Sequence, residues 1–120
     1  MVNNTKISLS YAGLSHIGDI PYIFHNLTKL YLSNNKIVSL SGIEVFQHLT
    51  HFSISFNHLE KIDELDKIKN PKLIQVLSVK GNLFCKNPLS NIFIIEKFKD
   101  LKDLDGYKIS EATYKVIEGI

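Results

Sequence analysis

The sequence predicts an α/β fold in which a short unit repeats about four times to build a right-handed solenoid with a helical cap at its C-terminal end. Apolar residues and an asparagine recur in one frame, most clearly at Leu27, Leu30, Leu32 and Asn35. The asparagines at positions 35, 57 and 82 are separated by 22 and 25 residues, and periods of this length are typical of solenoids. After Asn82 the frame ends and helical patterns begin.

Each repeat is expected to contribute a short strand, a turn and a return segment with further apolar residues. The first strand contains Ile7 and Leu9. Ala12 occupies the asparagine position of this repeat, which is degenerate, as terminal repeats commonly are. The insertion Lys69-Asn70-Pro71-Lys72-Leu73 contains turn-forming residues and lengthens the third repeat.

Asn35, Asn57 and Asn82 have a predicted structural role. The backbone turns inward after each strand, which leaves N–H and C=O groups without strand partners. A buried amide side chain both donates and accepts hydrogen bonds, so it satisfies such groups. We therefore expect the three asparagines to hold the turns.

The change of pattern after Asn82 divides the chain into two parts. We assign residues 1–82 to the repeats and residues 83–120 to a C-terminal cap with the start of a terminal helix. Ser90 or Asn91 is expected to cap a short helix that leads into a final strand.

The last residues predict a second helix. Ser110 followed by Glu111 is typical of a helix start, and an apolar stripe follows it. Because Ile120 falls within this helical pattern, we expect the chain to be the N-terminal domain of a longer protein.

The frame Leu-x-x-Leu-x-Leu-x-x-Asn is the leucine-rich repeat signature, and repeats near 22 residues resemble the short class first seen in the nuclear regulatory subunit of protein phosphatase 1. Gly81-Asn82-Leu83-Phe84-Cys85 and Leu104-Asp105-Gly106 resemble the C-terminal cap of that class. Leu83 replaces the usual proline, and the Tyr-Arg pair of the class is missing around Ser90-Asn91. Its members include the spliceosomal A-prime protein and centriolar and ciliary proteins, so the resemblance implies protein binding without catalysis.

Alternation along each strand predicts the binding surface. Successive side chains of a strand face opposite sides. Leu30 and Leu32 face the core, so Lys29, Tyr31 and Ser33 face the concave side. The same register in every repeat predicts a partner-binding surface made of Lys6, Ser8, Tyr11, Lys29, Tyr31, Ser33, Asn34, His51, Ser53, Ser55, Phe56, Ser78 and Lys80.

Tyr31 is the predicted anchor of this surface, because large, stiff, amphipathic side chains are enriched at interface hot spots. Tyr11 and Phe56 are expected to form an aromatic rim; the alternative is a solvated polar face with Phe56 packed into the neighbouring turn. Strands about 4.8 Å apart make a strip only roughly 20 Å wide, which suits one helix or an extended peptide. The open edge of the first strand offers a route to self-association, which Lys6 opposes.

The bulk composition excludes several classes of protein. A chain of 120 residues fits one small domain. It contains neither a run of about 18 apolar residues nor an apolar leader near its start. Cys85 is the sole cysteine, which favours a reducing compartment. All 14 basic residues are lysine, and the lack of guanidinium groups counts against direct nucleic-acid recognition.

Catalytic and metal-binding patterns are weak. His48 and His51 have superficial metal spacing, but they span a return segment and a strand, and no cysteine or carboxylate completes a ligand set. Cys85 is expected to be a buried small hydrophobic residue rather than a nucleophile. We therefore expect no metal, no cofactor and no enzymatic activity.

The sequence thus predicts a non-catalytic protein–protein interaction module that binds protein, with no direct nucleic-acid or membrane contact. The favoured setting is a larger cytoskeletal, centriolar or ciliary scaffold in the cytoplasm. One alternative is a nuclear subunit in spliceosomal or ribonucleoprotein assembly, with an RNA-binding protein as its partner. Another is a regulator that docks on an enzyme such as a phosphatase.

Overall fold

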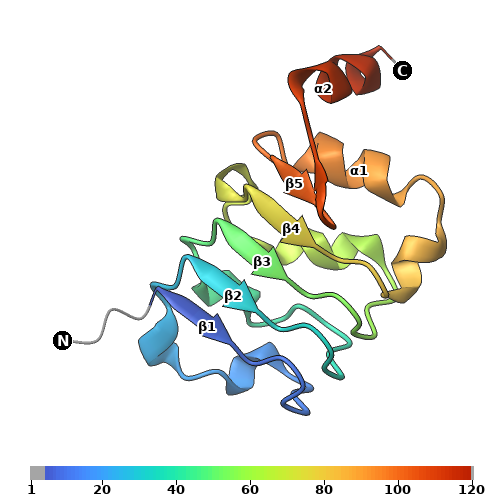
Figure 1. Ribbon diagram of the computed structural model, residues 1–120. Helices are drawn as coiled ribbons and strands as arrows, with labels where there is room; N and C mark the ends of the chain where they lie inside the picture. Colours follow the sequence, from blue (N-terminus) through green and yellow to red (C-terminus); the bar gives the residue numbers. More distant parts are fainter. Residues whose placement is uncertain (1–4, 120) are drawn as a thin grey trace.

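The computed structural model describes residues 5–119, which form one sheet with the strands in chain order. The first five strands are parallel, and the sixth pairs antiparallel with the fifth (Figure 1). Their bounds are β1 Lys6–Ser8, β2 Lys29–Tyr31, β3 His51–Ser53, β4 Val76–Ser78, β5 Asp103–Leu104 and β6 Tyr107–Lys108. This is the repeating parallel architecture that the frame predicts.

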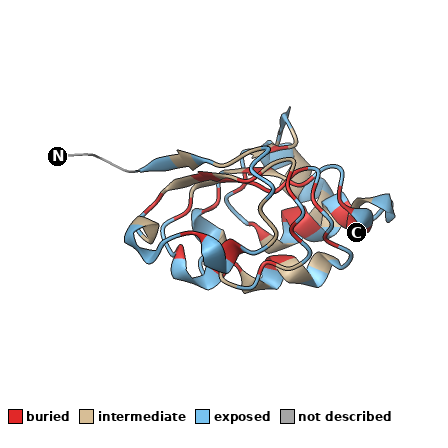
Figure 2. Cartoon of the chain, turned by 90° about the horizontal axis from the view of Figure 1, so that it is seen from below, coloured by how far each residue is buried: buried red, intermediate tan, exposed pale blue. Residues whose placement is uncertain are grey.

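The return segments form a second layer beneath the sheet (Figure 2). They are short 3₁₀ helices: Ile17–Asp19, Tyr22–Phe24, Ile43–Val45, Ile62–Lys67, Pro71–Leu73 and Leu83–Lys86. Segments of this length close single turns through i→i+3 hydrogen bonds, because they are too short for a stable α-helix. The α-helices within residues 5–119 lie in the C-terminal cap.

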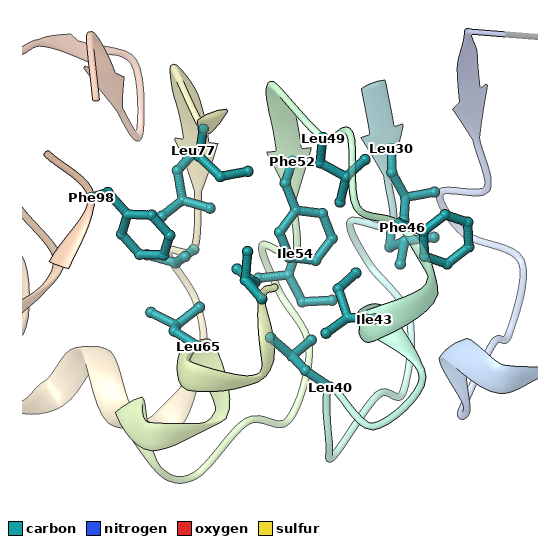
Figure 3. Close-up of a cluster of buried hydrophobic side chains, with 14 of the residues drawn as sticks. Leu30, Leu40, Ile43, Phe46, Leu49, Phe52, Ile54, Leu65, Leu77 and Phe98 are labelled. Carbon is teal, nitrogen blue, oxygen red and sulfur yellow. The ribbon is translucent and has the colours of Figure 1, made fainter. Parts of the chain in front are cut away.

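The core lies between the two layers and is built from stacked columns of apolar side chains. The middle residues of the five parallel strands pair in register as Ile7, Leu30, Phe52, Leu77 and Leu104. Leu40, Ile43 and Leu65 from the return segments face them across the interior (Figure 3). Each fully buried side chain of this size contributes about 1.5–3 kcal/mol of transfer free energy.

The three asparagines connect each repeat to the one before it. The Asn57 side chain accepts the Ile37 N–H at 3.0 Å and donates to the Leu32 carbonyl at 2.9 Å. Asn35 and Asn82 make equivalent hydrogen bonds to the repeats that precede them. The turn of each repeat is therefore held by a side chain of the next.

The residue directly before the asparagine position is left-handed in every repeat. The φ angles are 57° at Tyr11, 59° at Asn34, 56° at Phe56 and 84° at Gly81. Asparagine and glycine tolerate this conformation, whereas an aromatic side chain there is strained. The repeated geometry therefore imposes strain at two of the four positions.

The first cap helix starts differently from the sequence-based expectation. Helix α1 spans Ser90–Lys97, and Leu89 is its N-cap residue without a side-chain cap. Ser90 is buried in the first turn, and neither it nor Asn91 is the N-cap. Asn87 instead accepts the Leu89 N–H at 2.9 Å and orders the approach to the helix.

The second cap helix is α2, Glu111–Glu118, which begins at Ser110 in a capping box with Thr113. The Tyr114 hydroxyl donates to the Phe98 carbonyl at 2.8 Å and so ties α2 to the end of α1. Helix α2 ends at Glu118, so the expectation that the helical pattern continues through Ile120 falls partly outside the described residues. No helix within residues 5–119 is both long and apolar enough to cross a bilayer.

Between the two helices lies a tight hairpin that the sequence did not predict. Asp105 and Gly106 both have positive φ angles, 53° and 87°, as two-residue hairpin turns require. The Asp105 carboxylate also accepts the Val79 and Lys80 N–H groups at 2.7 and 3.1 Å. A side-chain oxygen thus replaces the backbone acceptor that a further parallel strand would supply.

Candidate functional site

The exposed face of the sheet collects the predicted surface residues into columns. Lys6, Lys29 and His51 are paired across β1, β2 and β3, and the column continues through Val76 to Asp103. A second column follows the strand ends: Ser8, Tyr31, Ser53 and Ser78. Because β-strand register brings these side chains to one face, the surface is continuous across five strands.

Tyr31 lies on β2, the second strand of this face, and is half-buried. The Lys6 ammonium lies 5.5 Å from the centroid of its ring, in a cation–π contact across β1 and β2. A ring held on one side by a lysine loses little conformational freedom when a partner covers it. Tyr31 is therefore suited to anchor a ligand.

Serines surround this ring and form the floor of the face. The Ser33 and Ser53 hydroxyls hydrogen-bond to each other. Ser55 is only 4% exposed, and its hydroxyl has no hydrogen-bond partner among the described residues. This burial places the Ser55 hydroxyl beneath the surface of the face, out of reach of a ligand. The small side chains allow a partner backbone to approach closely.

The two aromatic residues expected at the rim behave differently. Tyr11 is 80% exposed at the β1 end of the face. The Phe56 ring lies against Gly81, because a Cβ added to Gly81 would fall 2.3 Å from the Phe56 Cδ1 atom. Phe56 remains 50% exposed, but its ring packs into the neighbouring turn, which is the alternative that the sequence left open. The structure therefore does not bring the two rings together as one rim.

The charges on this face are unevenly distributed. Lys6 and Lys29 lie over β1 and β2, and Lys80 follows β4. Burial and, to a smaller extent, the Lys29 charge lower the pKa of His51. The imidazole is therefore neutral at pH 7, and its Nδ1 hydrogen-bonds with the Thr50 hydroxyl at 2.9 Å.

Acidic residues at the opposite end of the face were missed by sequence reasoning. Asp103 extends the column that starts at Lys6, and Asp105 lies just beyond it. Asp103 accepts the Gly106 N–H at 2.9 Å. The Leu104-Asp105-Gly106 segment was noticed only as part of the cap, although Asp103 and Asp105 add carboxylates to this end of the face, where Lys108 pairs with Asp103.

The structure contains little that fits catalysis. Between residues 5 and 119, no group of three or more His, Cys, Asp or Glu side chains is arranged to hold a metal ion. Burial raises the pKa of the Cys85 thiol, and its Sγ donates to the Val79 carbonyl at 3.3 Å. A protonated, half-buried thiol is a poor nucleophile.

The sequence family described as Leucine Rich repeats (2 copies) matches residues 25–67. Together with the repeated strands and the asparagine hydrogen bonds, this match makes the chain a leucine-rich repeat domain. The U2 small nuclear ribonucleoprotein A' of Candida albicans is 35% identical over 115 residues, which cover 93% of this chain and 48% of that protein. The similarity to the A' protein thus extends along nearly the whole of this chain.

Human leucine-rich repeat-containing protein 36 is 28% identical over 117 residues, covering 96% of this chain but 16% of that protein. The chain therefore spans about half or less of the length of the curated relatives that it matches.

Two solved structures share the fold. The Drosophila melanogaster SNF/U2A' complex matches with a TM-score of 0.70 at 20% identity, covering 96% of this chain and 61% of the matched chain. The Chaetomium Mex67:Mtr2 subunits match with a TM-score of 0.72 at 17% identity, covering 95% and 88%. At these identities the likeness concerns the fold alone. Leucine-rich repeat domains of this kind are protein-interaction modules.

Proposed function

We propose that this chain is the protein-binding module of a ribonucleoprotein assembly subunit of the A-prime kind, and that its partner binds the concave face of the sheet. The observation that carries this proposal is the 35% identity to the U2 small nuclear ribonucleoprotein A' across 93% of the chain. A solved neighbour is a complex of SNF with U2A'. By analogy, the partner of this chain is a SNF-like protein.

The geometry of the concave face supports a protein ligand. Tyr31 offers a large amphipathic surface steadied by Lys6, and Ser33 and Ser53 leave room beside it. A helix or an extended segment of the partner fills a strip of this width.

The relatives favour the ribonucleoprotein interpretation over the cytoskeletal, centriolar or ciliary scaffold that the sequence analysis placed first. An A-prime-like subunit belongs in the nucleus, so nuclear localisation is part of the proposal. The basic residues of the chain are all lysine, and we assign RNA contact to the partner rather than to this domain.

Calorimetric titration with a SNF-like protein tests this proposal. Tyr31→Ala is expected to weaken binding by about 2 kcal/mol, roughly thirtyfold, because truncating a central aromatic anchor typically has that effect. The matched control is Tyr107→Ala. Tyr107 is 78% exposed and pairs with the inward-facing Leu104, so its substitution leaves the concave face intact.

Two results would contradict the proposal in different ways. If the natural chain does not bind the SNF-like protein, the A-prime-like role is wrong. If Tyr31→Ala binds as tightly as the natural chain, the partner does not use the concave face. An unchanged thermal midpoint for both tyrosine variants shows that they fold.

A further inference from the structure

The insertion at residues 69–73 lies outside the concave face, and its side chains form a hollow on a flank of the solenoid. The hollow has a volume of about 630 Å³ and is lined by this segment together with Gln47 and His48 of the preceding repeat. The lining residues precede β3 and β4, so the hollow lies on the side where the strands begin. We call it the flank hollow.

Hydrogen bonds hold the wall of the flank hollow in place. The Asn70 Nδ2 donates to the Gln47 carbonyl of the preceding repeat at 2.7 Å. Pro71 begins a 3₁₀ turn, in which the Leu73 N–H donates to the Asn70 carbonyl at 3.1 Å. Leu73 is 42% exposed. The insertion thus presents an apolar side chain on an ordered backbone, which lowers the entropic cost of binding.

The rim of the flank hollow is basic and has no internal counter-charge. Lys69 and Lys72 are exposed, and the lining contains no carboxylate. The Glu64 and Asp66 carboxylates of the same repeat form ion pairs with other lysines. Within residues 5–119, neither Lys69 nor Lys72 takes part in an ion pair. Charge complementarity therefore favours an acidic ligand.

A second hollow adjoins the flank hollow on the side of the preceding repeats. Its volume is about 400 Å³, and it shares Gln47 and His48 with the flank hollow. Its wall includes Tyr22, whose ring stacks on His25 with centroids 4.5 Å apart. The carboxylate in this wall, Glu44, already accepts a backbone N–H of its own turn at 2.9 Å. A track across adjacent repeats suits an extended chain better than a single small molecule.

We propose that this flank binds an extended acidic peptide segment of a protein, with an apolar side chain against Leu73 and Pro71 and carboxylates over Lys69 and Lys72. The site uses no residue of the concave face and goes beyond the proposed function. RNA fits less well, because the flank hollow offers only the His48 imidazole for base stacking and no guanidinium group for phosphate.

The test uses short fluorescent peptides in which two apolar residues are flanked by Asp and Glu, by Lys, or by Ser and Gln. The apolar pair is varied among Leu, Ile, Phe and Trp. We expect the acidic peptides to bind at least about tenfold more tightly than the lysine peptides. In ¹⁵N spectra of the chain, the amide signals of residues 47–48 and 69–73 should shift on binding.

Paired variants separate this site from a general charge effect. Lys69→Glu with Lys72→Glu is expected to weaken acidic-peptide binding by about tenfold or more, because attraction becomes repulsion. Leu73→Ser should weaken binding severalfold through loss of the apolar contact. The control pair Lys61→Glu with Lys86→Glu changes the net charge equally on residues outside the flank hollow and should leave affinity unchanged.

The outcomes are distinct from those of the concave-face experiment. Tyr31→Ala should bind the acidic peptides normally, whatever its effect on the SNF-like protein. The proposal is overturned if no acidic peptide shifts the signals of residues 69–73 at about 1 mM, or if Leu73→Ser has no effect. It is also overturned if a single-stranded oligoribonucleotide displaces the peptides and binds this flank more tightly, which would make it an RNA site.

Discussion

The substitution Asn57→Ala removes a bridging side chain from buried backbone, and the hydrogen bonds around it determine the expected cost. The Leu32 and Ile54 carbonyls each lose one bond but keep another from a neighbouring asparagine. The Ile37 N–H, by contrast, is bonded only to Asn57 among the described residues, and Ile37 is fully buried. One unsatisfied buried group costs about 1–3 kcal/mol, so we expect unfolding to become easier by about 2 kcal/mol.

Asn35→Ala is expected to cost less, which makes the comparison informative. The Asn35 Oδ1 accepts the N–H groups of Ala12 and Leu14 at 3.1 and 2.9 Å. Ala12 is exposed and Leu14 half-buried, so water can replace the amide. The expected cost is about 1 kcal/mol or less. Asn82→Ala orphans the fully buried Leu59 N–H and should resemble Asn57→Ala.

Urea unfolding followed by circular dichroism measures these differences. With a slope of about 1–3 kcal/mol/M, Asn57→Ala should lower the midpoint by roughly 1 M. The exposed Asn26 provides the control, since Asn26→Ala should move the midpoint very little. Equal midpoints for Asn57→Ala and Asn35→Ala would refute the reasoning, because burial of the orphaned N–H would then not determine the cost.

Gly81→Ala should lower the free energy of unfolding by about 2 kcal/mol or more, because its φ is 84° and the new Cβ would lie 2.3 Å from the Phe56 Cδ1. Adding Phe56→Ala should restore the steric part only, which thermal unfolding of both variants can separate. Tyr11→Asn should stabilise the domain by about 0.5–1 kcal/mol, because Tyr11 is left-handed and 80% exposed; a lower melting temperature would contradict this. At Glu64, burial raises the pKa, but hydrogen bonds, chiefly from Lys67, lower it overall from 4.5. The resulting stability is present above the unfolded-state pKa and is lost as pH falls through the lower folded-state value. Urea midpoints of Glu64→Gln should therefore vary less with pH in this acidic range than those of the natural chain.

The repeat frame was sufficient to predict the fold because burial dictates residue type at the inward positions. Leu30, Phe52 and Leu77 occupy equivalent frame positions and are paired in the sheet. The same alternation predicts which residues face outward, including Tyr31. Regular periodicity therefore carries most of the information about the sheet and its exposed face.

The features that were missed depend on contacts between distant residues or on single turns. For the Phe56 ring, the sequence left two positions open, and the contact that decides between them is with Gly81, in the next repeat. Strand β6 exists because Asp105 and Gly106 form a tight turn, and two-residue strands leave no periodic pattern. The start of α1 was misassigned because Asn87 orders the approach to that helix from outside it.

Because each asparagine bonds the repeat before it, the two ends of the domain are expected to differ in stability. Asn57 serves the repeat that contains Ile37, and Asn82 serves the repeat that contains Leu59, so each repeat relies on its C-terminal neighbour. Unfolding that begins at β1 releases the backbone N–H groups that are hydrogen-bonded to Asn35. Each remaining repeat keeps its hydrogen bonds to the asparagine of the next repeat. Unfolding that begins at the cap instead removes, from each repeat that becomes terminal, the asparagine side chain that accepts its buried N–H group. Fraying, and the gain or loss of whole repeats during evolution, should therefore be tolerated better at the β1 end than next to the cap.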